Sequence, residues 1–184
     1  MQRRRVTSDM LTLVIGGARS GKSRFAFQLG CKARQPAYIA TARAEDAEME
    51  RRIARHREGR PAHWVTVEEP LAIARAVAAA AREQDFVLLD CLTVWLSNFC
   101  WEHREDNERE IEAGALAEVA RVAEASASSD VVVVSNEVGY GLVPESPVGR
   151  LFRDLQGWVN QEAARAADRV VQVVAGIPVE IKPR

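Results

Sequence analysis

The chain has 184 residues, of which 47% are hydrophobic and 28% charged, and its formal net charge is −1. This length fits one domain with a core of ordinary size. A near-neutral charge balance provides no overall field that attracts nucleic acid or a membrane surface, and no apolar stretch approaches the length of a transmembrane helix. The three cysteines, Cys31, Cys91 and Cys100, lack metal-ligand spacing, which is typical of a reducing compartment.

The order of apolar and polar segments predicts alternating strands and helices. Residues 1–10 are expected to form a polar extension, and one domain covers 11–184. Short apolar segments predict strands at 11–15, 36–40, 64–67, 86–89, 131–134, 170–174 and 179–181. Helical patterns are expected at 22–33, 45–58, 70–81, 111–125 and 150–166. We expect connections at 102–110, which is almost wholly charged, and at 139–149, which is rich in glycine and proline. The alternation predicts an α/β fold with a mostly parallel sheet flanked by helices.

A glycine-rich segment after the first predicted strand matches the phosphate-binding pattern G-x-x-x-x-G-K-[ST]. A strand, a tight loop and a helix start allow backbone N–H groups to surround phosphate oxygens. Lys22 is expected to reach the β- and γ-phosphates, and Ser23 to hold Mg²⁺ through its hydroxyl. The predicted nucleotide-binding residues of this loop are Gly16, Gly17, Ala18, Arg19, Ser20, Gly21, Lys22 and Ser23.

Polar residues follow two further predicted strands. Asp90 ends an apolar strand, where P-loop enzymes place a carboxylate that organises Mg²⁺; the alternative is a helix N-cap for the segment beginning at Cys91. Ser135, Asn136 and Glu137 follow the valine-rich strand, and either face the same crevice or form a turn stabilised by Asn136. In parallel sheets the carboxyl ends of the strands form the ligand crevice, so a binding site is expected at this edge.

The predicted helix at 45–58 and the residues just after it hold an unusual arrangement of charges. Arg52, His56 and Arg60 recur at intervals of four, so they form one column. Neighbouring cations attract phosphates and favour the neutral imidazole, which can act as a nucleophile. The alternative is a core histidine beside solvated arginines, and spacing alone favours that alternative. Glu68 and Glu69 likewise have two interpretations, as contacts to a base or ribose or as helix N-terminal carboxylates.

These residues resemble the bifunctional adenosylcobinamide kinase / adenosylcobinamide-phosphate guanylyltransferase family of cobalamin synthesis. The phosphate loop is shared by many families, whereas Asn136–Gly139 and Phe152–Asp154 in this order are more specific. The resemblance runs from Leu11 to Lys182. Its segments are Gly16–Ser23, Tyr38–Ala42, Arg52-Ile53, His56-Arg57, Arg60-Pro61, Trp64, Glu68–Pro70, Leu89–Thr93, Ser135–Gly139, Val143-Pro144, Arg150–Asp154, Asn160-Gln161, Ala167-Asp168 and Gly176–Pro178.

The resemblance implies a P-loop fold of the RecA-like type and a two-step chemistry. ATP or GTP first donates its γ-phosphoryl group to the aminopropanol hydroxyl of adenosylcobinamide. His56 then attacks the α-phosphorus of GTP, pyrophosphate leaves, and GMP passes to adenosylcobinamide phosphate to give adenosylcobinamide-GDP. His56 and Lys22 are thus expected to be catalytic, with Ser23 and Asp90 as Mg²⁺ ligands. Further nucleotide contacts are expected at Thr41, Arg57, Glu58, Gly59, Arg60, Glu68 and Asp90.

The resemblance also implies a homotrimer that binds nucleoside triphosphates and cobinamide substrates. Cysteine usage predicts a cytoplasmic location, and charge and composition predict no nucleic-acid partner and no membrane span. The main alternative is a small-molecule P-loop kinase with a single activity, in which His56 is structural and never modified. A nucleotide switch or nucleic-acid motor would need a basic groove, which the near-neutral charge disfavours.

Overall fold

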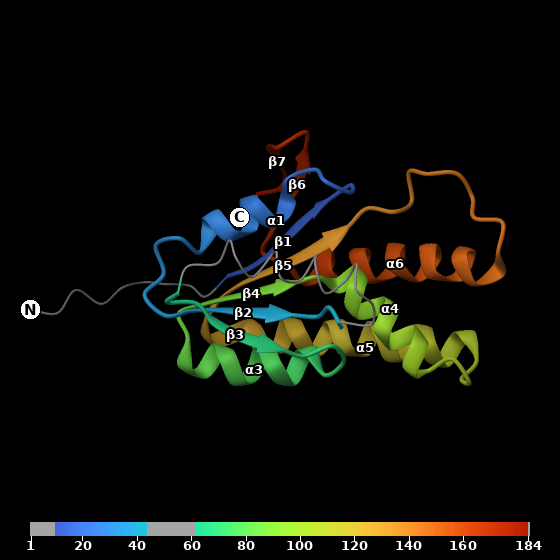
Figure 1. Ribbon diagram of the computed structural model, residues 1–184, viewed down its shortest axis with the longest axis horizontal. Helices are drawn as coiled ribbons and strands as arrows, with labels where there is room; N and C mark the ends of the chain where they lie inside the picture. Colours follow the sequence, from blue (N-terminus) through green and yellow to red (C-terminus); the bar gives the residue numbers. More distant parts are fainter. Residues whose placement is uncertain (1–9, 44–61, 184) are drawn as a thin grey trace, which may run out of the picture.

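The computed structural model describes residues 10–43 and 62–183. Seven strands form one sheet in the order β3-β2-β4-β5-β1-β6-β7, in which every neighbouring pair is parallel except the β6–β7 hairpin (Figure 1). The strands are β1 (Leu11–Gly16), β2 (Pro36–Ala40), β3 (Val65–Glu68), β4 (Phe86–Asp90), β5 (Asp130–Asn136), β6 (Arg169–Val174) and β7 (Ile177–Lys182). The helices are α1 (Lys22–Leu29), α3 (Ile73–Glu83), α4 (Leu92–Glu102), α5 (Glu108–Ala125) and α6 (Pro147–Ala166), with a 3₁₀ turn η1 (Ser126–Ser128).

Helices cover both faces of the sheet. α1 lies on one face, and α3, α5 and α6 lie together over the other (Figure 1). Since side chains alternate along a strand, neighbouring residues of β1 enter different cores: Leu13 packs with the α3–α6 layer, and Val14 packs on the α1 side. β5 is the central strand, and its four valines at 131–134 are all buried. This arrangement confirms the predicted α/β class and places the carboxyl ends of six parallel strands at one edge.

The predicted strands are confirmed to within two residues, and the larger differences concern the helices. α5 begins at Glu108 rather than 111 because Asn107 and Glu110 form a capping box, so the expected connection at 102–110 shortens. α6 begins at Pro147, where Ser146 accepts a hydrogen bond from the Gly149 N–H. α4 was not predicted as a helix, and α1 ends before Gly30 rather than at 33. The helix expected at 45–58 lies outside the described residues.

The start of α3 shows why a proline was a misleading marker. The helix begins at Ile73 and not at Pro70, because Glu69 accepts hydrogen bonds from the N–H groups of Leu71 and Ala72 at 3.0 and 2.9 Å. Burial alone raises the pKa of Glu69, but these two hydrogen bonds, together with Arg75, outweigh it and lower the pKa from 4.5. Glu69 thus stabilises the turn that leads into α3. The first turn of the helix itself contains no acidic residue, so the interpretation as a helix N-terminal carboxylate is met only just before the helix.

Replacing Glu69 with glutamine is expected to lower the free energy of unfolding at pH 7 by about 0.5–1 kcal/mol, because a charged hydrogen-bond acceptor is lost from the turn before α3. A lowered folded-state pKa means that the stabilisation is present above the ordinary pKa of 4.5 and is lost as the pH falls through the folded-state value. The variant should therefore lose less stability than the parent on acidification below pH 4.5. Urea unfolding at several pH values tests this, with Glu105→Gln, 88% exposed, as the control. Parallel pH curves for parent and variant would contradict it.

Within the described residues, no helix combines the length and apolarity needed to cross a bilayer.

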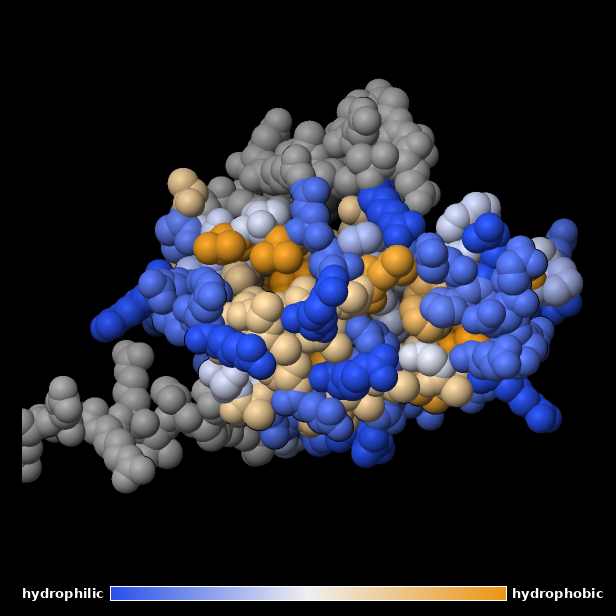
Figure 2. All heavy atoms as spheres, turned by 90° about the horizontal axis from the view of Figure 1, so that it is seen from below, coloured by the Kyte–Doolittle hydropathy of each residue, from blue (hydrophilic) through white to orange (hydrophobic). Residues whose placement is uncertain are grey.

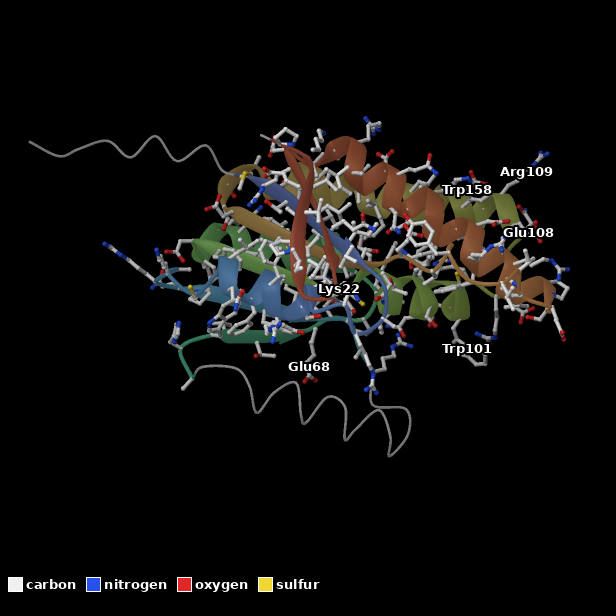
Figure 3. The ribbon with its side chains drawn as sticks, turned by 90° about the horizontal axis from the view of Figure 1, so that it is seen from above. Lys22, Glu68, Trp101, Glu108, Arg109 and Trp158 are labelled. Atoms are coloured by element: carbon white, nitrogen blue, oxygen red, sulfur yellow. The ribbon has the colours of Figure 1, made fainter. Side chains whose placement is uncertain are left out.

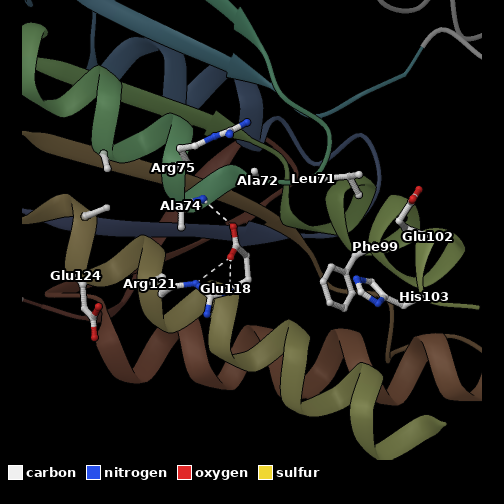
Figure 4. Close-up of a pocket in the computed structure, with 12 residues that line it drawn as sticks. Leu71, Ala72, Ala74, Arg75, Phe99, Glu102, His103, Glu118, Arg121 and Glu124 are labelled. Carbon is white, nitrogen blue, oxygen red and sulfur yellow. Dashed lines mark hydrogen bonds and ion pairs between the residues drawn. The ribbon is translucent and has the colours of Figure 1, made fainter. Parts of the chain in front are cut away.

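The α3–α5 face carries a surface hollow of about 680 Å³, with hydrophobic residues gathered over its middle and hydrophilic ones around them (Figure 2). Its wall includes the Glu118 carboxylate, which accepts hydrogen bonds from the Ala74 N–H at 2.9 Å and from Arg121 at 2.6 Å (Figure 4). Glu118 thus provides a hydrogen-bond acceptor for a backbone N–H in the first turn of α3. None of the sequence-predicted site residues lines this hollow.

Candidate active site

The phosphate loop joins β1 to α1 in a conformation suited to anions. Gly21 has φ 95° and Arg19 has φ 55°, so the chain turns through left-handed conformations before the helix. The first turn of α1 has no side-chain cap and no acidic residue. Its N–H groups and the positive end of the helix dipole are therefore directed at the space in front of the loop. This geometry matches the predicted phosphate site.

Lys22 lies within this loop and is 8% exposed. Its Nζ donates a hydrogen bond to the Gly17 carbonyl at 3.0 Å, which folds the side chain back across the loop. The hollow in front encloses about 530 Å³ and is lined by Arg19, Ser20, Gly21, Lys22, Ser23, Arg24, Ala175 and Gly176. Most of the predicted phosphate-binding residues therefore line one cavity.

The second wall of this cavity is the β6–β7 turn, which lies between the strands predicted at 170–174 and 179–181 and was not assigned to the site. The Gly176 N–H donates to the Ser20 carbonyl at 2.8 Å, and both turn residues are left-handed, Ala175 with φ 51° and Gly176 with φ 82°. The fit is close, since a Cβ added to Gly21 would lie 3.2 Å from the Gly176 Cα. The signals in the sequence were a glycine after a strand that ends at the same edge and the presence of Gly176–Pro178 among the segments of the family resemblance.

Asp90 stands at the carboxyl end of β4, and β5 separates that strand from β1. Tyr38 on β2 donates its hydroxyl proton to the Asp90 Oδ2 at 3.0 Å. The helix N-cap interpretation is wrong, because the N-cap of α4 is Cys91 and no side-chain hydrogen bond caps that helix. Asp90 is thus an oriented carboxylate at the sheet edge, as its Mg²⁺ interpretation requires.

Cys91 directly follows Asp90 and is the N-cap residue of α4. Burial is the main cause that raises the pKa of Cys91, and the charge of Asp90 raises it too. Hydrogen bonds from the backbone of Val94 and Thr93 and the charge of Lys22 oppose the rise, and the resulting pKa is about 11. Ser23 and Asp90 also offer a hydroxyl and a carboxylate, oxygen donors of the kind that suits Mg²⁺. Within the described ranges, no cluster of three or more His, Cys, Asp or Glu side chains forms an all-protein metal site.

Thr41 joins the ends of β2 and β4. Its fully buried hydroxyl donates to the Cys91 carbonyl and accepts from the Cys91 N–H, both at 2.9 Å. Asn98 from α4 donates to the Thr41 carbonyl at 2.8 Å and to the Pro70 carbonyl at 3.2 Å. Sequence reasoning missed Asn98, because its partners lie 57 and 28 residues away. The nucleotide contact expected of Thr41 stays a prediction.

The segment at the end of β5, residues 135–137, matches neither interpretation completely. Ser135 is fully buried and donates to Asn160 on α6 at 2.6 Å, so it does not face the crevice. The local turn is held by Glu137, not by Asn136, since the Glu137 carboxylate accepts from the Gly139 N–H at 3.1 Å. The backbone N–H of Glu137 donates to the Gly16 carbonyl at 3.0 Å and so ties this segment to the phosphate loop.

For two groups of predicted nucleotide contacts, the described part of the chain shows no position at the phosphate loop. Glu68 ends β3 and points outward, apart from Lys22 (Figure 3). His56, Arg57, Glu58, Gly59 and Arg60 lie outside the described residues. Their predicted roles stay predictions.

A phosphate loop at the carboxyl edge of a parallel sheet, with one strand between it and the aspartate strand, defines a P-loop nucleotide-binding fold. An ATPase from the type III secretion system of pathogenic bacteria has the same fold, with a TM-score of 0.57, 10% sequence identity, and coverage of 94% of this chain and 57% of that chain.

The chain belongs to the cobinamide kinase / cobinamide phosphate guanyltransferase family, whose model matches residues 12–181. It is 44% identical over 177 residues to the bifunctional adenosylcobalamin biosynthesis protein CobP of Pseudomonas aeruginosa, covering 94% of this chain and 98% of that protein. It is 42% identical over 181 residues to the corresponding CobU proteins of Escherichia coli and Salmonella typhimurium, with 94% of this chain and all of each relative covered.

Proposed function

We propose that this chain phosphorylates adenosylcobinamide and then transfers GMP from GTP to adenosylcobinamide phosphate. The observation that supports it most is a phosphate loop that leads into an uncapped helix start, with the Lys22 side chain folded across the loop, in a chain that belongs to this family. Phosphoryl transfer needs positioning and charge stabilisation more than covalent chemistry by the protein. This arrangement supplies both.

In the kinase step, the aminopropanol hydroxyl bonds to the γ-phosphorus and the bond to the β-phosphate oxygen breaks. The loop N–H groups and Lys22 hold the triphosphate and stabilise the charge on the leaving diphosphate. Ser23 and Asp90 would hold Mg²⁺, which neutralises charge on the β- and γ-phosphates when bound. Glu68 and Thr41 are proposed as further contacts of the nucleotide.

In the guanylyl step, an imidazole nitrogen of His56 bonds to the α-phosphorus of GTP, and pyrophosphate leaves. A phosphate oxygen of adenosylcobinamide phosphate then attacks the same phosphorus, and the imidazole is released. The segment Arg57–Arg60 is proposed to bind the phosphates during this exchange, because guanidinium groups pair well with them. We also propose that the enzyme is a cytoplasmic homotrimer, which light scattering and fractionation would test.

The proposed activity is tested by incubating the chain with Mg²⁺, GTP and adenosylcobinamide and separating the corrinoids by chromatography and mass spectrometry. Formation of adenosylcobinamide phosphate followed by adenosylcobinamide-GDP is expected. The phosphate alone would indicate the single-activity kinase. Neither product, with nucleotide still bound, would overturn the proposal.

Tyr38→Phe tests whether Asp90 needs the hydrogen bond that orients it. We expect kcat of the kinase step to fall about fivefold, since one hydrogen bond contributes about 1 kcal/mol, while KM for adenosylcobinamide stays unchanged. Ser129→Ala is the control, because it removes a hydroxyl hydrogen bond of 3.0 Å to Gln84 at the opposite edge of the sheet. Both variants should lose similar stability, and only Tyr38→Phe should lose turnover. Equal turnover in the two variants would show that Tyr38 has no positioning role.

A further inference from the structure

The loop that joins β5 to α6, residues 137–146, exposes an unusual amount of apolar surface. Tyr140 is 83% exposed, Leu142 97% and Val143 63%, and Val148 in the first turn of α6 is 76% exposed. The stretch from Val138 to Pro144 contains no charged residue, in a chain that is 28% charged. Large apolar side chains grouped on a surface in this way usually mark a binding site.

This loop is held in shape at both ends. Arg150 donates to the carbonyls of Pro144 and Glu145 at 3.1 and 2.6 Å. Gly149 packs so closely that an added Cβ would lie 2.9 Å from the Pro144 Cβ. At the other end, the Glu137 carboxylate accepts a hydrogen bond from the Gly139 N–H. The apolar side chains in the middle are therefore presented outward from a braced backbone.

The same loop stands next to the phosphate site. It leaves the tip of β5, the strand beside β1, and runs beyond the sheet edge before it reaches α6 (Figure 1). Its first residue is tied to the start of the phosphate loop by the bond from the Glu137 N–H to the Gly16 carbonyl, 3.0 Å long. An acceptor hydroxyl must meet the γ-phosphate at this edge, so the acceptor molecule lies within reach of the loop.

Neighbouring segments at this edge offer less apolar surface. Directly after β2 in the chain, Thr41 is fully buried, and directly after β4, Cys91 is 8% exposed. Directly after β6, Ala175 and Gly176 line the hollow in front of the phosphate loop. Among the described segments that follow the parallel strands, the β5–α6 loop is the one that exposes several large apolar side chains beside an uncharged backbone stretch.

We propose that Tyr140, Leu142 and Val143 bind the corrin macrocycle of the acceptor substrate and hold its aminopropanol arm toward the phosphate loop. The macrocycle is a broad ring system with methyl groups and neutral amides, so it matches an apolar and uncharged surface. The inference rests on the proposed function, because that function supplies the corrinoid acceptor. The rival occupant of this surface is a second copy of the chain.

Tyr140→Ser, Leu142→Ser and the double variant test the proposal. Dicyanocobinamide is the probe, measured by equilibrium dialysis with its visible absorbance, and GTP binding is measured in parallel by calorimetry. We expect each single variant to raise the Kd for dicyanocobinamide about tenfold, and the double variant to raise it further, since each removes a large apolar contact. The Kd for GTP should not change. Ile181→Ser is the matched control, because Ile181 is 56% exposed and lies at the end of the β6–β7 hairpin that is far from its turn.

An unchanged Kd for dicyanocobinamide in the double variant, with GTP binding intact, would overturn the loop assignment and leave the proposed function standing. A change of molar mass in light scattering, with corrinoid binding retained, would also overturn it and would assign the surface to contacts between copies. Failure of the unmodified chain to bind dicyanocobinamide would overturn the assignment together with the proposed function.

Discussion

Replacing Lys22 with methionine is expected to lower the rate of adenosylcobinamide phosphorylation on the order of 10²–10³-fold, because the variant lacks the cation that stabilises charge on the transferring phosphoryl group. Methionine keeps the apolar stem, which matters because Lys22 is only 8% exposed. Guanylyl transfer should also fall, since the same loop is proposed to hold the triphosphate of GTP in both steps. The measurement is the initial rate of each product at saturating GTP.

Lys32→Met is the matched control for this variant, because Lys32 is exposed just beyond the other end of α1. It should retain both activities. A Lys22→Met enzyme that keeps its kinase rate within about threefold of the parent, a difference of less than 1 kcal/mol in barrier height, would contradict the assigned role of the lysine.

Replacing His56 with asparagine is expected to separate the two activities. Loss of a covalent nucleophile typically costs several orders of magnitude, so guanylyl transfer should fall at least ~10³-fold. Phosphorylation of adenosylcobinamide should continue near the parent rate, because that step needs the phosphate loop and not the imidazole. Both rates are measured from the same mixture, by quantifying adenosylcobinamide phosphate and adenosylcobinamide-GDP.

His63→Asn serves as the control, because His63 is exposed and has no proposed role. It should retain both activities. Loss of both activities in His56→Asn, with the fold intact by circular dichroism, would assign the histidine to the structure. Retention of both would show that another group accepts the guanylyl moiety.

Local patterns predicted the parts of the fold that depend on short stretches of sequence. The valine run at 131–134 is buried on both faces, as a central parallel strand must be, so composition alone identified it. α4 was harder, because Trp95 and Asn98 are both buried on it, and a helix that buries apolar and polar residues together has weak periodicity. The start of α3 depended on a hydrogen bond that the Glu69 carboxylate accepts from the Ala72 N–H, which a proline-based rule does not include.

The candidate site likewise has a part that is local in the sequence and a part that depends on tertiary contacts. The phosphate loop could be predicted because its glycines, lysine and serine are consecutive in the chain. The hydrogen bond from Tyr38 to Asp90 joins residues 52 apart, and the turn at Gly176 reaches the loop only through the sheet order. Such contacts depend on tertiary structure, so residue types and spacing do not reveal them. Exposure of Leu142 is likewise a property of the folded surface.

The central claim, that one chain uses a histidine to move GMP, is tested most directly by labelling with GTP that carries a radioactive α-phosphate. After incubation with Mg²⁺ and denaturation, we expect acid-labile and base-stable label on the parent chain and none on His56→Asn. Adding adenosylcobinamide phosphate before denaturation should move the label into adenosylcobinamide-GDP. Product formation by a parent chain that never becomes labelled, or label that persists in His56→Asn, would contradict the proposed mechanism.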